Sequence, residues 1–194
     1  MDTKTRILKA SLALFNEEGE DNQAAIDIAN ALEISPGNLY YHFKGKDAII
    51  HALFDEFEEE LRIVLAGAER LSGSPEDLWV YLHILADEIW DFRFFYLNLV
   101  SLLRRYPDLA RRFRRLTEAK RGALSEALQR VEAGGGADFE GAALDLVVDQ
   151  ILYRLIFWPI MAAVDGRDEA GDLVDEVILH CVSAVAPYLT AAEA

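Results

Sequence analysis

The sequence predicts an all-α protein, and two observations support this fold class. Apolar side chains recur at three- and four-residue steps along nearly the whole chain, as they do on the buried faces of helices. No stretch sustains a two-residue alternation, and no Asn-Gly or Asp-Gly turn joins two strand-like runs. The 194 residues, 52% hydrophobic and 27% charged, suffice for one or two compact domains.

Three short helices are predicted at the N-terminal end. The first covers about residues 3–18 and ends at Gly19, because glycine readily leaves the helical conformation. Two shorter helices follow at about 23–32 and 35–43. The apolar face of the first helix is formed by Ile7, Leu8, Leu12, Leu14 and Phe15.

Six further helices are predicted in the rest of the chain. Ser74 is a suitable N-cap and Pro75 fits the first helical position, so a helix starts there. The glycines at 134–136 form the clearest break. The six expected ranges are 46–71, 75–92, 95–105, 107–131, 139–164 and 169–189. The first would be about 39 Å long, so it is expected to belong to two domains.

Composition and motifs exclude several classes of protein. The single cysteine, Cys181, rules out an intramolecular disulfide and favours the cytoplasm. The four histidines lack zinc-site spacing, so no metal and no cofactor are expected. No phosphate-binding glycine loop, nucleophile elbow or His-Glu-x-x-His motif is present, so an enzyme is not expected. The apolar run at 10–15 is too short for a signal peptide.

The most apolar stretch, residues 142–164, has the length of a membrane span. Charged, polar and helix-distorting residues interrupt it, namely Asp145, Asp149, Gln150, Arg154 and Pro159. Each charge at the bilayer centre costs about 2.5–3.5 kcal/mol. The stretch is therefore interpreted as a buried helix of a soluble protein with no membrane partner.

Residues 25–43 have the pattern of a helix-turn-helix. Small and apolar side chains are spaced to form a core between two short helices, namely Ile28, Ala29, Leu32, Ile34, Leu39 and Phe43. In this motif the second helix presents side chains to the DNA major groove. The residues expected to contact DNA are Gln23, Ser35, Pro36, Gly37, Asn38, Tyr40, Tyr41, His42, Lys44 and Lys46. Tyr40 is either partly in the core or directed at phosphate.

The charge balance opposes this interpretation in part. The chain carries a formal charge of −15, with a pI of about 4.6, whereas nucleic-acid-binding surfaces are usually basic. Residues 1–50 contain five basic and eight acidic side chains. Two stretches, 3–16 and 34–46, carry lysines and one arginine without any acid, and these would have to supply the phosphate contacts.

At these residues the chain closely resembles the TetR family of bacterial transcriptional regulators. The run at 39–47, Leu-Tyr-Tyr-His-Phe-Lys-Gly-Lys-Asp, is similar to the family signature, and residues 6–19 fit its first helix. Residues 35–43 and 94–107 resemble a branch that includes regulators of polyhydroxyalkanoate genes. The chain departs from the family pattern at the start of its second helix, where Ala24, Ala25 and Ile26 stand, and in the turn, where Glu33 replaces glycine.

The resemblance implies a three-helix DNA-binding domain at 1–46 and a six-helix ligand-binding and dimerisation domain at 47–194. The expected function is ligand-responsive regulation, most simply repression, by a homodimer on a palindromic double-stranded DNA operator. A small hydrophobic, anionic or neutral effector would release the DNA, with the helix from Lys46 as the lever. The alternatives are an all-α enzyme or carrier for a hydrophobic molecule, and a constitutive DNA-binding protein.

The middle helices are rich in aromatic residues, which form either an ordinary core or the wall of an effector pocket. The residues expected in such a pocket are Phe54, Phe57, Leu61, His83, Trp90, Phe94, Phe95, Phe113, Gln150, Tyr153 and Phe157. Residues 104–121 hold eight of the 19 basic side chains. That segment is a solvated face, a site for an anionic group such as a coenzyme A phosphate, or a second nucleic-acid surface.

The last two helices are expected to form the homodimer interface. Their apolar stripes are wider than an exposed surface normally carries, and two copies would form a four-helix bundle. The residues expected in the interface are Leu146, Ile151, Leu155, Ile160, Leu173, Val174, Val177, Ile178, Cys181, Val182 and Val185.

Overall fold

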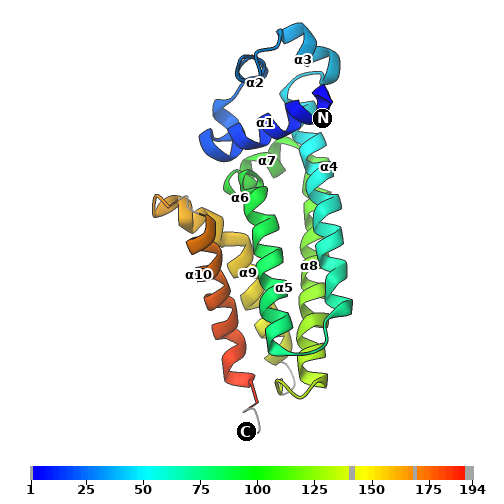
Figure 1. The fold of residues 1–194 in the computed structure, drawn as a ribbon, viewed down its shortest axis with the longest axis vertical. Helices are drawn as coiled ribbons and strands as arrows, with labels where there is room; N and C mark the ends of the chain where they lie inside the picture. Colours follow the sequence, from blue (N-terminus) through cyan, green and yellow to red (C-terminus); the bar gives the residue numbers. More distant parts are fainter. Residues whose placement is uncertain (1, 140–142, 168–169, 191–194) are drawn as a thin grey trace. The chain divides into compact units, whose positions relative to one another are not determined.

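The computed structural model describes residues 2–139, 143–167 and 170–190, and these residues form ten α-helices (Figure 1). The helices are α1 Thr3–Glu18, α2 Ala25–Ala31, α3 Pro36–His42, α4 Lys46–Leu65, α5 Pro75–Asp91, α6 Arg93–Leu97, α7 Leu99–Arg105, α8 Pro107–Ala133, α9 Ala143–Val164 and α10 Ala170–Val185. Short 3-10 helices span Glu20–Asn22, Ala66–Arg70 and Ala186–Tyr188. Within the described part no strand is present beyond one isolated bridge, so the all-α prediction is confirmed.

The chain divides into two compact units. The N-terminal unit comprises the residues up to Glu59 together with 92–111, and the C-terminal unit comprises 60–91 and the residues from Arg112 onward. Helices α4 and α8 each contribute residues to both units. These compact units do not end where the functional domains at 1–46 and 47–194 were expected to meet. The division into a DNA-binding and a ligand-binding domain therefore stays a prediction.

The ends of the N-terminal helices follow from local chemistry. The Asp2 carboxylate accepts a hydrogen bond from the Thr5 backbone N–H at 2.7 Å, which caps α1. Gly19 ends the same helix at a φ of +85°, a conformation that favours glycine. The Ser35 hydroxyl accepts from the Asn38 N–H at 3.1 Å, and Pro36 occupies the first turn of α3.

The segment expected as one helix at 95–105 is two helices, α6 and α7. The break lies at Asn98, whose side-chain amide donates to the Phe94 carbonyl at 3.1 Å. Asparagine side chains compete in this way with the helical backbone ladder, so helices end beside them. The last helix ends at Val185 rather than 189, where Pro187 lies in a 3-10 turn. Residues 140–142 and residue 169, also expected in helices, lie outside the described residues.

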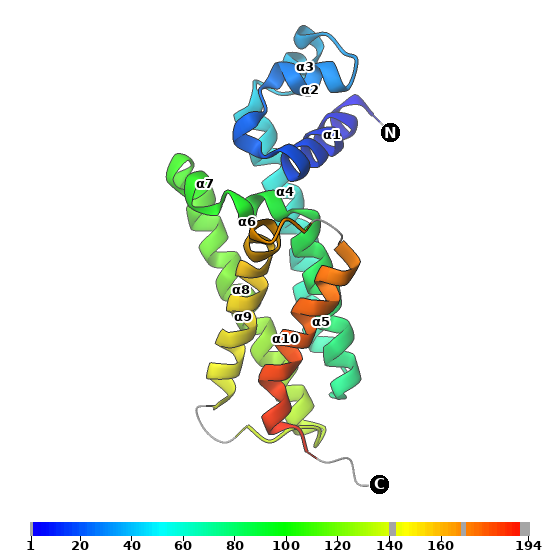
Figure 2. The ribbon, with the colours of Figure 1, turned by 90° about the vertical axis from the view of Figure 1, so that its left-hand side faces the viewer.

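The C-terminal unit is built around α5, α9 and α10, and α10 packs against both of the others (Figures 1 and 2). Helix α9 is long and apolar enough to cross a membrane by length and composition, although half of its most apolar window is buried inside the protein. Its apolar residues are therefore divided between an inner face, which packs in this unit, and an outer face.

Candidate nucleic-acid interface

Helices α2 and α3 pack as a helix-turn-helix around a small apolar core. Ile28 and Ala29 of α2 are fully buried, and Leu39 of α3 is 2% exposed. The Ile34 N–H donates to the Ala29 carbonyl at 3.0 Å, which folds the turn back on α2. Burial of these side chains fixes the direction in which α3 presents its other residues.

Glu33 occupies the turn at a φ of +55°, in the left-handed region. A residue other than glycine pays a strain of about 1–3 kcal/mol there. The turn therefore keeps the geometry of a helix-turn-helix at the expense of local stability.

Replacing Glu33 by glycine should raise the free energy of unfolding by about 1 kcal/mol, because glycine adopts this φ without strain. Chemical denaturation of the whole chain measures the change. The matched control is Glu17→Gly, at an exposed residue of α1. It should instead lower the free energy of unfolding, because glycine is unfavourable within a helix. Equal destabilisation by both variants would contradict the strain argument.

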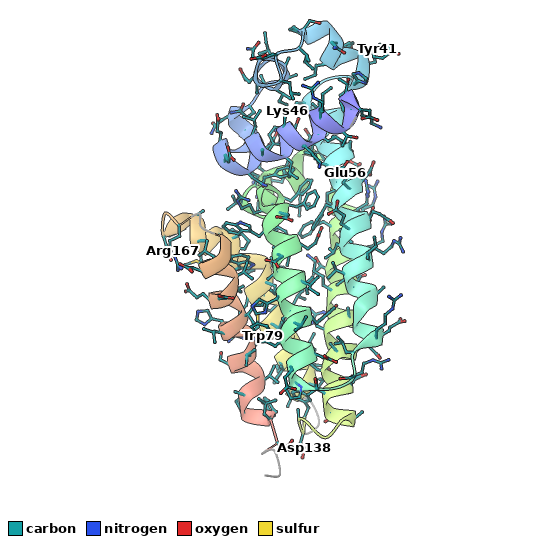
Figure 3. The ribbon with its side chains drawn as sticks, viewed as in Figure 1. Tyr41, Lys46, Glu56, Trp79, Asp138 and Arg167 are labelled. Atoms are coloured by element: carbon teal, nitrogen blue, oxygen red, sulfur yellow. The ribbon has the colours of Figure 1, made fainter. Side chains whose placement is uncertain are left out.

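The outer surface of α3 is polar and aromatic. Asn38 is exposed, Tyr40 and Tyr41 are 57% and 78% exposed, and the Tyr41 side chain points away from the helix (Figure 3). The His42 ring is half-buried and meets Tyr41 edge-on at 5.2 Å. The Lys44 ammonium lies 4.6 Å above the Tyr40 ring, which holds a cation beside α3. Ser35, Pro36 and Gly37 are exposed at the N-terminal end of this helix.

Two of the residues expected to contact DNA have partners inside the N-terminal unit. Gln23 is 7% exposed and donates to the Glu18 carboxylate at 2.7 Å. The Lys46 ammonium lies 2.9 Å from a Glu20 carboxylate oxygen and donates to the Glu20 backbone carbonyl at 2.9 Å. The structure therefore leaves Lys44 exposed and holds Lys46 against an acid.

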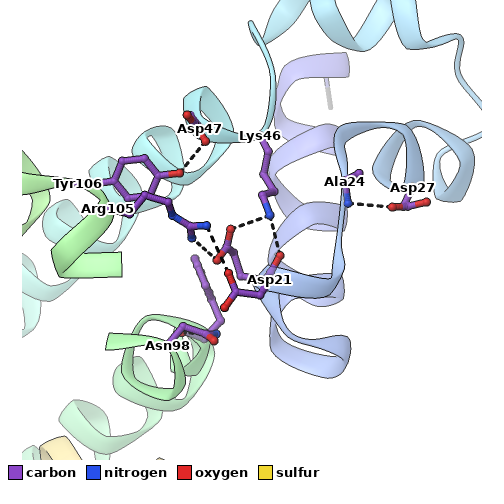
Figure 4. A network of polar contacts seen from close by, with 10 residues as sticks. Asp21, Ala24, Asp27, Lys46, Asp47, Asn98, Arg105 and Tyr106 are labelled. Atoms are coloured by element: carbon purple, nitrogen blue, oxygen red, sulfur yellow. Dashed lines mark hydrogen bonds and ion pairs between the residues drawn. The ribbon is translucent and has the colours of Figure 1, made fainter. Parts of the chain in front are cut away.

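The same acid also binds an arginine from far along the chain (Figure 4). Glu20 is fully buried, and its second carboxylate oxygen accepts from Arg105 at 2.5 Å. Arg105 also reaches Asp21 at 3.3 Å, and Tyr106 donates to Asp47 at 2.6 Å. Sequence reasoning assigned Arg105 only to the basic segment, since nothing local in the sequence connects it with Glu20.

The residues expected in an effector pocket are divided between the two units. In the N-terminal unit the Phe54, Phe57 and Phe95 rings contact each other with centroids 5.2–5.9 Å apart, and Phe94 contacts Phe95 at 4.0 Å. Phe15 of α1 lies 5.3 Å from Phe94, so this cluster joins α1, α4 and α6. These side chains form the core of the N-terminal unit.

The remaining pocket candidates lie in the C-terminal unit, where Leu61 and Phe113 are buried. Trp90 stacks on Trp158 at 4.9 Å, and His83 lies 3.2 Å from Asp175. Gln150 is exposed and accepts from Arg154 at 3.4 Å. Arg121, in the basic segment, pairs with Asp149.

Tyr153 and Phe157, the last two pocket candidates, are 53% and 52% exposed on α9. They line a groove of about 540 Å³ between α9 and α10. Its other walls carry Arg154, Arg167, Glu176 and His180 beside apolar groups. The groove is thus an apolar depression with a charged rim.

Most residues expected in the dimer interface are buried within this chain. The buried members are Ile151, Leu155, Leu173, Val174, Val177, Ile178, Cys181 and Val185. Burial raises the pKa of the Cys181 thiol to about 12. Ile160 and Val182 are half-buried, and Leu146 is 61% exposed. The stripe of α10 therefore packs on α5 and α9, and the apolar surface left outside belongs mainly to α9.

Two ionisable groups with strongly shifted pKa values lie in the C-terminal unit, the fully buried Lys120 and the half-buried Glu88. Lys120 of α8 is fully buried, and burial lowers its pKa to about 7 although Glu88 opposes the change. Burial and the nearby charges of Glu60 and Asp91 raise the pKa of Glu88 to about 7. The Lys120 ammonium lies 5.5 Å from the Phe113 ring centre. Sequence reasoning missed this pair, because Lys120 appeared only as part of the basic segment.

Comparison with known proteins places the chain among bacterial regulators. The family model described as "Bacterial regulatory proteins, tetR family" matches residues 7–53, and "Bacterial transcriptional repressor" matches residues 56–194. The chain is 28% identical to "HTH-type transcriptional repressor Rv1474c" of Mycobacterium tuberculosis, over 78% of this chain and 81% of that protein.

Solved structures have the same fold. A TetR-family transcriptional regulator from Marinobacter aquaeolei superposes with a TM-score of 0.89 at 30% identity, covering 98% of this chain and 92% of that one. A complex of SmeT with triclosan has a TM-score of 0.63 at 20% identity, covering 97% and 92%. These similarities do not test the resemblance to polyhydroxyalkanoate regulators, which stays a prediction. Because the second family model alone covers more than two thirds of the residues, the chain belongs to the TetR family of bacterial transcriptional regulators.

Proposed function

We propose that this regulator is a ligand-responsive repressor, which binds a palindromic operator as a homodimer and acts in the cytoplasm, where the DNA lies. The observation that carries the proposal is the outer surface of α3. Asn38, Tyr41 and Lys44 are exposed there, while the residues on the inner side of α2 and α3 pack as a helix-turn-helix core. A regulatory rather than an enzymatic role agrees with the names of the Mycobacterium tuberculosis and Marinobacter aquaeolei relatives, a repressor and a transcriptional regulator.

In this proposal α3 enters the major groove. Asn38, Tyr41 and His42 contact base edges, and Lys44 and Lys46 contact phosphates on either side. Two copies of α3 would reach successive major grooves about 34–36 Å apart. The net charge of −15 would weaken non-specific binding, so the contacts of α3 would carry a large share of the affinity.

Dimerisation through the outer face of α9 is supported by its exposed apolar residues. These are Leu146, Tyr153, Phe157, Met161 and Val164, each more than half exposed. They follow one another at steps of seven, four, four and three residues, so all five lie on one face of the helix. A soluble chain rarely leaves such a stripe open to water, and a second copy of α9 and α10 would cover it.

A small hydrophobic effector with a polar or anionic group is the proposed signal. Buried polar atoms of the C-terminal unit support this, since Tyr81 Oη, Glu88 Oε1 and Trp158 Nε1 have no hydrogen-bond partner among the described residues. Such atoms are costly unless something binds them. Because α4 runs through both units, it is the proposed lever.

Lys44→Ala should weaken binding to all duplexes about five- to tenfold near 0.1 M salt. It should also reduce the salt slope by about one unit, because one phosphate contact is lost. Fluorescence anisotropy measures both on the duplex selected most strongly from a random-sequence pool. Arg70→Ala, which removes an exposed cation outside the helix-turn-helix, should leave both unchanged.

An unchanged affinity and slope in Lys44→Ala would refute the docking of α3. The effector part is tested by titrating long-chain fatty acids and acyl-coenzyme A into the same complex. Release of the duplex by these compounds supports the proposal, whereas operator binding that none of them affects favours a constitutive DNA-binding protein.

A further inference from the structure

The Glu20 carboxylate, fully buried in the N-terminal unit, is shared by two cations (Figure 4). One oxygen lies 2.9 Å from the Lys46 ammonium, and the other accepts a hydrogen bond from Arg105 at 2.5 Å. A buried carboxylate is stable only with compensating charge, so at least one of the two cations must stay beside it.

The two cations hold Glu20 unequally. Arg105 donates to one Glu20 oxygen and also reaches Asp21 with its other terminal nitrogen at 3.3 Å. The Glu20 oxygen beside Lys46 has no aligned hydrogen bond within the described residues, and Lys46 donates instead to the backbone carbonyl of Glu20. Arg105 is therefore the firm partner of the carboxylate, and Lys46 is the one that can leave.

Lys46 and Arg105 lie on different segments of the N-terminal unit. Lys46 is the first residue of α4, shortly after α3 ends at His42, and it is 21% exposed at its side chain. Arg105 is the last residue of α7, and the following α8 continues from Pro107 into the C-terminal unit. One cation thus lies beside the proposed DNA surface and the other on the segment that leads to the rest of the chain.

We propose that Arg105 and Lys46 compete for Glu20, so that Arg105 controls how much of the Lys46 charge is available to operator phosphates. With Arg105 in place the buried carboxylate is compensated, and Lys46 can turn to a phosphate. When Arg105 is removed or displaced, Glu20 retains Lys46, and the DNA loses one contact. The inference rests on the proposed function, because it requires that the N-terminal unit binds DNA.

The competition gives the protein a means of regulation. Tyr106 donates to Asp47 at 2.6 Å, and His51 lies 3.0 Å from Asp108, so the α7–α8 junction also contacts the first turns of α4. A displacement of this junction would move Arg105 relative to Glu20. The affinity for DNA would then fall, because Lys46 would stay with Glu20, although α3 itself would not change.

The test compares duplex binding of the full chain over a range of salt concentrations, using the duplex selected from a random pool. Arg105→Gln should lower affinity about five- to tenfold near 0.1 M salt and reduce the salt slope by about one unit. Lys46→Ala should do the same in the wild-type background and nothing further in Arg105→Gln. The double variant Glu20→Gln/Arg105→Gln should recover the wild-type slope, because a neutral amide no longer retains Lys46.

Two further variants separate this mechanism from loss of structure. Glu20→Gln alone should keep the full salt slope, whereas a purely structural Glu20 would weaken binding when changed. Arg104→Gln, which removes the adjacent exposed arginine, is the matched control and should bind as the wild type does. Thermal unfolding by circular dichroism shows which variants fold.

The inference is overturned if Arg105→Gln keeps the wild-type slope, or if Lys46→Ala lowers affinity equally in both backgrounds. It is also overturned if Glu20→Gln weakens binding as much as Arg105→Gln does. A wild-type chain without salt-dependent duplex binding would instead overturn the proposed function, and this inference with it.

Discussion

Phe157→Glu is expected to convert the regulator from a dimer into a monomer and to lower operator affinity at least about 100-fold. Phe157 lies in the middle of the exposed apolar stripe of α9, with Tyr153 and Met161 one turn away on either side. In a symmetric pair of helices the two glutamates would face each other in an apolar contact. Burying an unpaired carboxylate costs several kcal/mol, and two such penalties in one interface would outweigh the favourable free energy of dimerisation.

Sedimentation velocity at micromolar concentration measures the oligomeric state, and anisotropy measures operator binding. The matched control is Ile63→Glu, which introduces the same charge at an apolar residue of α4 that is 62% exposed. The control should remain dimeric and bind DNA. If Phe157→Glu stays dimeric, or if wild type sediments as a monomer, the α9 face is not the interface.

The second large effect concerns the half-buried Glu88 and the fully buried Lys120. Lys120 has a pKa of about 7 instead of the usual 10.5, so between these values the unfolded chain binds a proton that the folded chain lacks. The free energy of unfolding therefore rises with pH over this window. Glu88 has a pKa of about 7 instead of 4.5, so the folded chain holds the extra proton and stability falls as pH rises from 4.5 to 7. Stability should pass through a minimum near pH 7.

Replacing both residues by methionine should raise the free energy of unfolding at pH 7 by about 1–4 kcal/mol, because apolar side chains need no compensation when buried. The minimum near pH 7 should disappear at the same time. Urea denaturation at pH 5.5, 7 and 9, at one fixed protein concentration, measures both effects.

The control for this experiment is Arg114→Met, a change at an exposed cation on the same helix. It should leave the pH profile unchanged. A wild-type profile that is flat between pH 5.5 and 9, or a double variant that is less stable at every pH, would contradict the shifted pKa values of Glu88 and Lys120.

The sequence by itself determined the parts of this protein that depend on neighbours in the chain. The all-α class follows from apolar periodicity, and the start of α3 follows from Ser35 and Pro36, whose effects reach only a few residues. The helix-turn-helix is likewise local, since Ile28, Ala29 and Leu39 lie within a dozen residues of each other. The segment at 93–105 shows the limit, because a single side-chain hydrogen bond at Asn98 divided an otherwise continuous pattern.

The tertiary structure alone decided which apolar face is inside and which distant charges meet. Helix α9 carries apolar residues on every side, so periodicity could not tell that Ile151 packs inward while Phe157 lies outward. The packing of α5 and α10 decides it. Glu20 and Arg105 are 85 residues apart, and they meet because the end of α7 lies beside the short turn between α1 and α2. Lys120 looks in the sequence like its exposed neighbours in the basic segment, but packing within the C-terminal unit buries it fully. Each of these outcomes depends on desolvation by elements far away in the chain, a quantity that local spacing does not contain.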